Sequence, residues 1–241
     1  MIWRAAELGL KEVCFTDHID REENGCDEMV FDFDDYNASY SGLEIPKGLQ
    51  VRYGVEYGLK PTNVEEMQVD LSRRHFDFVI GSIHLVDEYD IYLEPYWQDK
   101  SQYEAERRYF QAMLDSVQAH DDFDVLGHLT FISRVRANPT HRLITMDMHG
   151  DLIDEVLKTL VAKGKGLEIN TSGVDRCGDY LPGVEFLKRF RELGGQIVTV
   201  GSDAHTASRV GQYSREACAI AKEIFGHVCT FADRKVTFHK L

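Results

Sequence analysis

The sequence predicts an α/β protein in which helices cover a parallel sheet and one large domain is arranged as a barrel. The chain has 241 residues, close to the roughly 250 of a typical α/β barrel. Short apolar, β-branched runs alternate with longer stretches of helical spacing, which is the pattern of βα units. No repeat, low-complexity segment or linker divides the chain, so residues 1–241 are expected to form a single domain.

Six apolar runs are the expected strands. Each is apolar on both faces, as a parallel sheet covered by helices requires. They comprise residues 12–16, 49–55, 76–81, 123–127, 166–170 and 196–201. A helix-like stretch at residues 3–8 precedes the first run, and no strand precedes that stretch. The barrel is therefore expected to open on its second unit.

Five helices are expected between and after these strands, at residues 62–74, 101–120, 146–163, 184–193 and 208–224. Gly164, Gly194 and Gly226 follow three of them, as is typical of helix C-termini. Residues 227–231 and 235–238 predict a small terminal hairpin.

The charge balance disfavours several classes of partner. The chain carries 27 Lys and Arg against 41 Asp and Glu, a formal net charge of −14, and this field repels nucleic acid and anionic membranes. No apolar run approaches the ~18 residues of a membrane span. The five cysteines are odd in number and include no C-x-x-C pair, which favours reduced thiols in a cytoplasmic protein.

Side chains able to bind a metal follow five of the six runs. The carboxyl ends of parallel strands form the active-site edge of a barrel, so these side chains are expected to converge there. Imidazole and carboxylate together suit Zn, Mn or Fe. A single histidine after a strand is usually structural, but four of ten in this position favour a metal site, and the other six are expected to be structural. The candidate ligands are His18, Glu56, His84, His128, Asp203 and His205.

Six sequence blocks at these positions resemble the PHP (polymerase and histidinol phosphatase) superfamily, specifically its histidinol-phosphatase branch. They read Thr-Asp-His at 16–18, Gly-Val-Glu-Tyr-Gly at 54–58, Gly-Ser-Ile-His at 81–84, Gly-His-Leu at 127–129, Glu-Ile-Asn-Thr-Ser-Gly at 168–173 and Gly-Ser-Asp-Ala-His at 201–205. The resemblance implies a distorted (β/α)7 TIM-like barrel with up to three divalent ions at its carboxyl face. It also implies a metal-dependent phosphatase of histidine biosynthesis that converts L-histidinol phosphate and water to L-histidinol and phosphate.

The sequence departs from the family at its start. Family members begin with a strand that ends in His-x-His, followed by another metal-binding His or Asp, and this sequence has neither. By the resemblance, six ligands are present and three are absent with the first strand. The family site holds up to three ions, and a site with fewer ions is possible here. A truncated gene model or fragment is favoured over a protein that works with an incomplete site, because a missing strand exposes two sheet edges. The oligomeric state stays open.

The resemblance and the chemistry of phosphate esters suggest roles for these ligands. Clustered divalent ions lower the pKa of bound water and neutralise charge on the phosphoryl oxygens. Glu56 is the expected bridging carboxylate, with His84 and His128 at one ion and His18 and His205 at another. Asp203 is expected to be a ligand that also accepts a proton from the attacking water.

Other polar residues have two possible roles. Arg134 is the candidate clamp on the phosphoryl group, because guanidinium suits phosphate, and Arg136 is its rival. Asn170 binds the substrate or a ligand, or else holds the turn that follows it. Asp17 orients a ligand histidine or caps a turn. The aromatic segment 86–99 forms either a lid over the substrate or a small satellite core.

Three alternatives to histidinol phosphatase remain. One is a PHP phosphoesterase that hydrolyses another small phosphate ester, and another is a catalytically incomplete barrel that binds metal or a partner. A polymerase-associated nuclease is least favoured, because the chain has no basic patch for nucleic acid.

Overall fold

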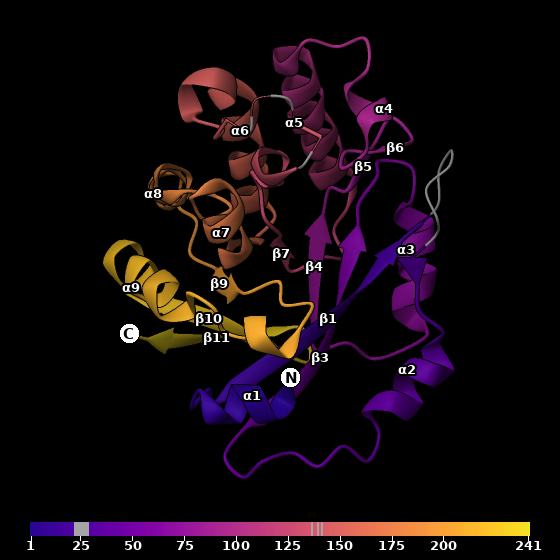
Figure 1. Cartoon of the computed structure of the whole chain (residues 1–241), viewed down its shortest axis with the longest axis vertical. Helices are drawn as coiled ribbons and strands as arrows, with labels where there is room; N and C mark the ends of the chain where they lie inside the picture. Colours follow the sequence, from indigo (N-terminus) through magenta and orange to yellow (C-terminus); the bar gives the residue numbers. More distant parts are fainter. Residues whose placement is uncertain (22–28, 136, 139, 141) are drawn as a thin grey trace.

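The computed structural model describes residues 1–21, 29–135, 137–138, 140 and 142–241. Its main sheet has the strand order β2 (Met29–Val30), β1 (Glu12–Asp20), β3 (Gln50–Gly58), β4 (Phe78–Ser82), β7 (Val125–Leu126), β8 (Gly166–Asn170) and β9 (Val198–Gly201). Neighbours from β1 to β9 run parallel, and only β2 is antiparallel to its neighbour. All six expected strands are confirmed (Figure 1).

The sheet curls but does not close. In the described residues β1 and β9 do not pair with each other, so the sheet is open where a further barrel strand would lie. The expected α/β architecture is therefore confirmed as an open, curled half-barrel. The strands β1 and β3 are longer than expected and pair from Glu12–Gln50 to Ile19–Tyr57. His18 and Glu56, expected beyond their strands, lie within them as direct neighbours in register.

Helices flank the sheet. The long pair α5 (Gln102–Ala119) and α6 (Met146–Ala162) packs over it with α8 (Val184–Glu192), and α3 (Val64–Ser72) lies against another part (Figure 1). Helix α5 begins with a capping box, in which Ser101 and Glu104 satisfy each other's backbone N–H groups. Shorter helices are α1 (Ile2–Glu7), α2 (Phe33–Tyr40), α4 (Glu94–Trp97) and α7 (Val174–Cys177).

One helix start was wrongly expected. Helix α9 spans Ser214–Ile224 and does not begin at residue 208. A 3-10 turn, Ala207–Arg209, comes first, and Tyr213 then adopts a left-handed conformation with φ of 55°. That conformation interrupts the helical path, so the apolar spacing upstream belongs to a loop.

A terminal hairpin closes the amino end of the sheet. Its strands are β10 (His227–Ala232) and β11 (Lys235–Lys240). Phe231 stacks on Phe78 with 4.9 Å between ring centroids. In the turn, Arg234 Nε donates to Asp124 Oδ2 at 2.6 Å, and the backbone N–H of Asp233 donates to Asp77 Oδ1 at 3.0 Å. The hairpin thus joins the starts of β4 and β7. No helix in the described part of the chain is long and apolar enough to cross a membrane.

Candidate metal centre

Glu56 is the centre of a cluster at the carboxyl edge of the sheet. Its side chain is nearly buried, and three imidazoles from three neighbouring strands surround it. Glu56 Oε1 lies 2.8 Å from His128 Nε2 and 3.2 Å from His84 Nε2, and Oε2 lies 3.6 Å from His18 Nε2. The parallel register produces this arrangement, because it brings the ends of β1, β3, β4 and β7 to one edge.

The two imidazoles of His84 and His128 also face each other. Their Nε2 atoms are 3.3 Å apart, beside the same Glu56 oxygen. At this distance either one Nε2 carries a hydrogen that it donates to the lone pair of the other, or a cation lies between two lone pairs. Glu56, His84 and His128 form a group whose ligand atoms lie within 4.8 Å of one another, close enough to hold one metal ion.

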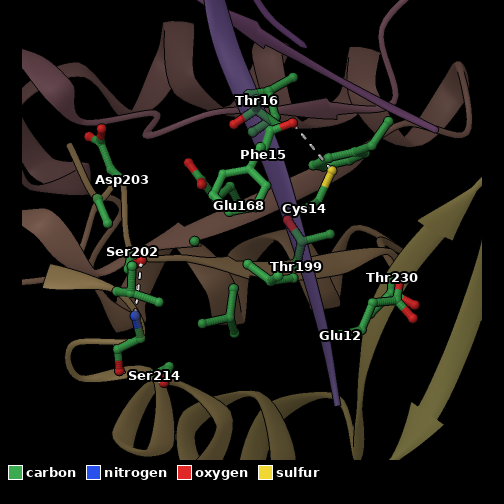
Figure 2. Close-up of a pocket in the computed structure, with 18 of the residues that line it drawn as sticks. Glu12, Cys14, Phe15, Thr16, Glu168, Thr199, Ser202, Asp203, Ser214 and Thr230 are labelled. Carbon is green, nitrogen blue, oxygen red and sulfur yellow. Dashed lines mark hydrogen bonds between the residues drawn. The ribbon is translucent and has the colours of Figure 1, made fainter. Parts of the chain in front are cut away.

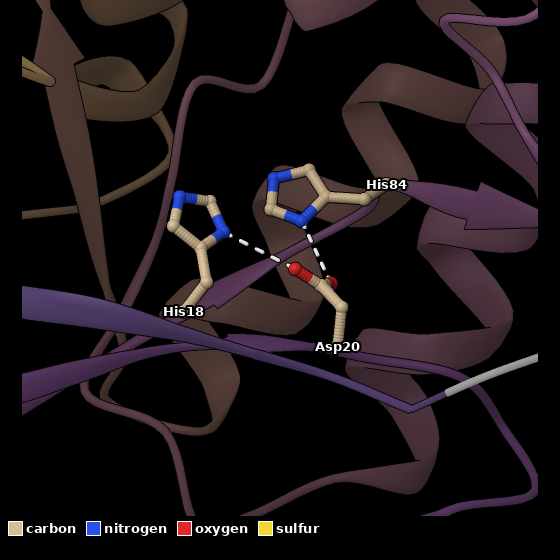
Figure 3. A group of neighbouring side chains, drawn as sticks. All are labelled: His18, Asp20 and His84. Atoms are coloured by element: carbon tan, nitrogen blue, oxygen red, sulfur yellow. Dashed lines mark hydrogen bonds and ion pairs between the residues drawn. The ribbon is translucent and has the colours of Figure 1, made fainter. Parts of the chain in front are cut away.

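Asp20 is a member of the site that the sequence reasoning missed. Its Oδ1 lies 2.9 Å from His84 Nδ1 and its Oδ2 lies 3.1 Å from His18 Nδ1 (Figure 3). His18, Asp20 and His84 form a second group close enough to hold a metal ion. His84 therefore belongs to both groups, with one ring nitrogen directed at each.

Charge within the cluster shifts several pKa values. Burial alone would raise the pKa of Asp20 and of Glu56, but the neighbouring imidazoles outweigh burial and hold both values well below the ordinary range. Burial disfavours a charged His84, yet Asp20 and Glu56 together raise its pKa well above the usual value. For His128, burial outweighs the attraction of Glu56 and lowers the pKa. The cluster thus stabilises positive charge between its carboxylates.

Asp203 and His205 lie on the other side of the opening, after β9. His205 Nδ1 is 3.4 Å from Asp203 Oδ1, and its ring centroid is 5.9 Å from that of His18. The His205 side chain is 70% exposed. Asp203 and His128 both have positive φ, at 48° and 21°, which is strained for residues other than glycine and is common at functional sites.

Arg134, the candidate clamp, lies in the same place. Its Nη1 donates to Asp203 Oδ2 at 2.7 Å and to Ser172 Oγ, and its guanidinium lies over the Phe131 ring at 4.5 Å. The Nε atom is buried without a hydrogen-bond partner. Asp203 and Ser172 therefore fix the position of the guanidinium beside the cluster. The rival, Arg136, lies outside the described residues.

Glu168 is a second carboxylate that the sequence reasoning missed. It is 4% exposed, and its Oε2 accepts hydrogen bonds from the backbone N–H of His128 at 3.0 Å and from Asn170 Nδ2 at 3.1 Å. Burial, followed by repulsion from Glu56, raises the pKa of Glu168 to about 8. A Cβ at Gly201 would lie 1.9 Å from Glu168 Oε1, so the glycine on β9 makes room for this carboxyl group.

Two residues with alternative roles are placed by the structure. Asn170 Oδ1 accepts the Ser172 N–H at 3.0 Å and so holds the turn, while its Nδ2 also lies 3.5 Å from Asp203 Oδ2. Asp17 is exposed and accepts the Tyr40 hydroxyl at 2.7 Å. The histidine-orienting role considered for Asp17 belongs to Asp20.

The histidines outside the cluster have structural partners where the structure describes them. His120 and His227 contact backbone carbonyls, His239 contacts Thr230, and His149 contacts Glu106. His75 forms a third potential metal group with Asp77 and Asp233. Both Asp77 oxygens already accept backbone N–H groups, which explains this group as part of the hairpin attachment. His141 lies outside the described residues.

The residues of the cluster fit divalent metal ions. Three imidazoles and two carboxylates supply the mixed N and O donors that Zn, Mn and Fe accept. Asp20 bonds the second nitrogen of His18 and of His84, which is how carboxylates orient metal-binding histidines. The fold and the site thus define an open α/β barrel with a candidate metal centre at its carboxyl edge, the arrangement of a metal-dependent hydrolase.

Comparison with known proteins agrees with that class. The family model described as "PHP domain" matches residues 1–172. The chain therefore belongs to the PHP family.

Named relatives lie within one branch of that family. The chain is 33% identical over 227 residues to a "Probable histidinol-phosphatase" of Clostridium acetobutylicum, covering 92% of this chain and 86% of that protein. It is 31% identical over 244 residues to the "Histidinol-phosphatase" of Lactococcus lactis, covering 99% and 90%.

Solved structures share the fold. The histidinol phosphate phosphatase of Lactococcus lactis, crystallised with zinc, L-histidinol and phosphate, aligns with a TM-score of 0.89 at 28% identity over 98% of this chain and 90% of that one. A structure from Listeria monocytogenes aligns with a TM-score of 0.68 at 16% identity, covering 89% and 92%.

Proposed function

We propose that this chain is a metal-dependent phosphomonoester hydrolase that acts on L-histidinol phosphate and produces L-histidinol and phosphate. The observation that carries the proposal is the convergence of Glu56 with three imidazoles on the same edge of the sheet as the Arg134–Asp203 ion pair. Two relatives carry the histidinol-phosphatase name over most of their length, and the solved relative binds zinc, L-histidinol and phosphate. Both support this substrate.

The predicted ligands would hold divalent metal ions, with zinc the first choice because the solved relative contains it. Glu56, His84 and His128 would bind one ion, and His18 with His205 and Asp203 another. Bound ions would lower the pKa of a water molecule and neutralise charge on the phosphoryl oxygens. A set of up to three ions, as the family resemblance implies, remains part of the proposal.

Arg134 binds the phosphoryl group in this mechanism. Planar guanidinium donors match phosphate oxygens, and Asp203 and Ser172 hold this guanidinium beside the cluster. Asp203 holds Arg134 in place and is also the residue proposed to accept the proton of the attacking water. Asn170 positions Asp203 from the preceding strand end and can present its amide to the substrate.

The aromatic wall beside the cluster suits an imidazole-bearing substrate. Phe131 contacts the rings of His84 and His128, with centroids 5.5 and 4.4 Å away, and Tyr92 packs on Phe131 at 5.4 Å. Tyr96 and Trp97, which belong with Tyr92 to segment 86–99, are buried in the core. Segment 86–99 thus contributes Tyr96 and Trp97 to the main core, not to a separate satellite core, and places Tyr92 next to the site.

Further parts of the proposal rest on composition and family. Residues 1–241 form one domain that works in the cytoplasm, in histidine biosynthesis. Nucleic acid and membranes are not partners, because the net charge is −14.

The test is phosphate release from L-histidinol phosphate after reconstitution with Zn or Mn, with Glu56→Gln as the inactive comparison. Glucose 6-phosphate and O-phosphoserine serve as competing esters. We expect a kcat/KM at least tenfold higher for L-histidinol phosphate than for either ester. A higher kcat/KM for another ester would show that L-histidinol phosphate is not the substrate, but the protein would still be a phosphomonoester hydrolase.

The open sheet favours one second candidate, a metal-binding barrel without turnover. In the described residues β1 and β9 do not pair with each other, so the site is open on the side between them. Tight zinc binding with no phosphate release from any of the three esters would support this candidate and overturn the proposed reaction.

A further inference from the structure

The imidazole of His128 is held differently from the other two imidazoles around Glu56. Asp20 bonds Nδ1 of His18 at 3.1 Å and Nδ1 of His84 at 2.9 Å, and so orients both rings. Nδ1 of His128 is buried and has no hydrogen-bond partner among the described residues. The direction of its Nε2, which lies 2.8 Å from Glu56 Oε1, therefore depends strongly on the backbone of His128.

The backbone of His128 is in an uncommon conformation. Its φ of 21° is positive, and residues other than glycine keep such a conformation only where their surroundings hold it. On one side the His128 carbonyl accepts the Phe131 N–H at 2.7 Å and so begins the turn that follows. On the other side the pairing of β7 with β8 ends at Leu126 and Leu167, before it reaches His128. The His128 N–H thus needs an acceptor from outside the strand ladder.

The side chain of Glu168 on β8 supplies that acceptor. Glu168 and Asp203 both line the cavity of about 950 Å³ beside the cluster (Figure 2). Glu168 Oε2 accepts the His128 N–H at 3.0 Å and Asn170 Nδ2 at 3.1 Å. Asp20 contacts the rings of its histidines, whereas Glu168 contacts the backbone of His128. The carboxyl group therefore acts on the conformation that directs the ring.

Two glycines leave the space that this carboxyl group needs. A Cβ at Gly201, on β9, would lie 1.9 Å from Glu168 Oε1. A Cβ at Gly127, directly after β7, would lie 2.7 Å from Ser82 Oγ and 3.5 Å from Glu168 Oε2. A side chain at Gly201 would displace the carboxyl group, and one at Gly127 would crowd it. The strands on both sides of β8 are thus shaped around Glu168.

We propose that Glu168 is the positioning residue for His128. Its carboxyl oxygen holds the N–H of a residue with positive φ, and the backbone of that residue in turn directs Nε2 to the point shared with Glu56 and His84. This role needs no contact between Glu168 and an ion or the substrate. The inference rests on the proposed function, because it takes His128 as a metal ligand.

The test compares Glu168→Gln with Glu168→Met. Both variants remove the charge and nearly keep the shape, but only glutamine keeps an oxygen that can accept the His128 N–H. The difference between the two variants therefore isolates the acceptor. We expect the methionine variant to bind zinc more weakly than the glutamine variant by about tenfold or more, measured by competition with a fluorescent chelator.

Amide hydrogen exchange with EDTA present gives a second readout that depends on neither metal nor turnover. The His128 N–H should exchange about tenfold faster or more in the methionine variant than in the glutamine variant. The Leu167 N–H, which donates to the Ile197 carbonyl at 3.0 Å, is the internal control and should exchange alike in both. Ile169→Val shortens the next buried side chain of β8 and should leave the zinc affinity unchanged, which separates positioning from a loosened strand.

Three results would overturn the inference. They are equal zinc affinity of the glutamine and methionine variants, equally faster exchange at Leu167 and His128, and wild-type exchange at His128 as fast as in an unfolded chain. The wild-type measurement does not depend on whether either variant folds. Each result would overturn the inference alone if the wild type binds zinc and releases phosphate. A wild type that binds no zinc would overturn the proposed function together with the inference.

Discussion

Replacing Glu168 by glutamine is expected to stabilise the metal-free protein, although the residue lies at the centre of the site. Glutamine keeps the shape and the carbonyl acceptor for the His128 N–H and the Asn170 amide. It removes only the negative charge that burial and Glu56 disfavour. The side chain is already protonated in most native molecules at pH 7, because its pKa is raised to about 8.

The size of the effect follows from proton linkage. In the unfolded chain Glu168 loses its proton near pH 4.5, whereas the native protein holds it until about pH 8. Below pH 4.5 both states are protonated and the residue has no effect. Between these values each pH unit lowers the free energy of unfolding by about 1.4 kcal/mol. The wild type should therefore lose about 3 kcal/mol by pH 7, and glutamine should restore it.

Urea unfolding between pH 5.5 and 8.5 with EDTA measures this directly. The difference between Glu168→Gln and wild type should grow with pH at about 1.4 kcal/mol per unit and level off near pH 8. Any packing change caused by glutamine adds a constant that does not vary with pH. Glu44→Gln, in an exposed loop, is the control for the substitution itself. A flat difference for Glu168→Gln would refute the reasoning, since Glu168 would then titrate alike in both states.

Three further predictions concern other residues. Glu106 is fully buried against His149 and Arg142, and although burial alone would raise its pKa, these partners lower it to about 2. Glu106→Gln should lower the free energy of unfolding by about 3 kcal/mol at pH 7. Urea titrations should show that the difference between variant and wild type shrinks below pH 4.5, because the wild type itself loses the stabilisation from ionised Glu106 there. Arg134→Lys should raise the inhibition constant of inorganic phosphate at least tenfold at unchanged zinc content. An unchanged inhibition constant would show that Arg134 does not bind phosphate. His84→Ala should lower the zinc content, because His84 contacts Glu56 in the cluster, whereas His75→Ala, at the hairpin attachment, should not. Elemental analysis that finds equal zinc in both variants would contradict this assignment.

Much of the fold could be predicted because the sheet is buried on both faces. A strand covered by helices must be apolar throughout, so the six parallel strands are visible as continuous apolar runs. The short strands β2, β5 (Leu85–Val86) and β6 (Tyr89–Asp90) were missed. Each has only two residues, and a two-residue strand has no periodicity to detect.

The site could be predicted in part for a related reason. His84, His128 and Asp203 follow apolar runs immediately, and their types mark them as candidates. Asp20 was missed because β1 continues past Thr16 to Asp20, a length that depends on pairing with β3 up to Ile19 and with β2 at Asp20, and not on apolarity. Glu168 was missed because it lies inside an apolar run, where a lone acid looks like an exception and only the fold shows that it faces other carboxylates.

The contacts of the terminal hairpin with the main sheet form late in folding. Its turn bonds to Asp77 and Asp124, which lie 156 and 110 residues earlier in the chain than their partners. Contacts of such long separation form late, because the entropy of closing the loop must be overcome first. During synthesis the amino end of the sheet therefore stays uncovered, with Phe78 exposed, until Phe231 has left the ribosome. A nascent chain of this protein should consequently bind chaperones until its last strands are made.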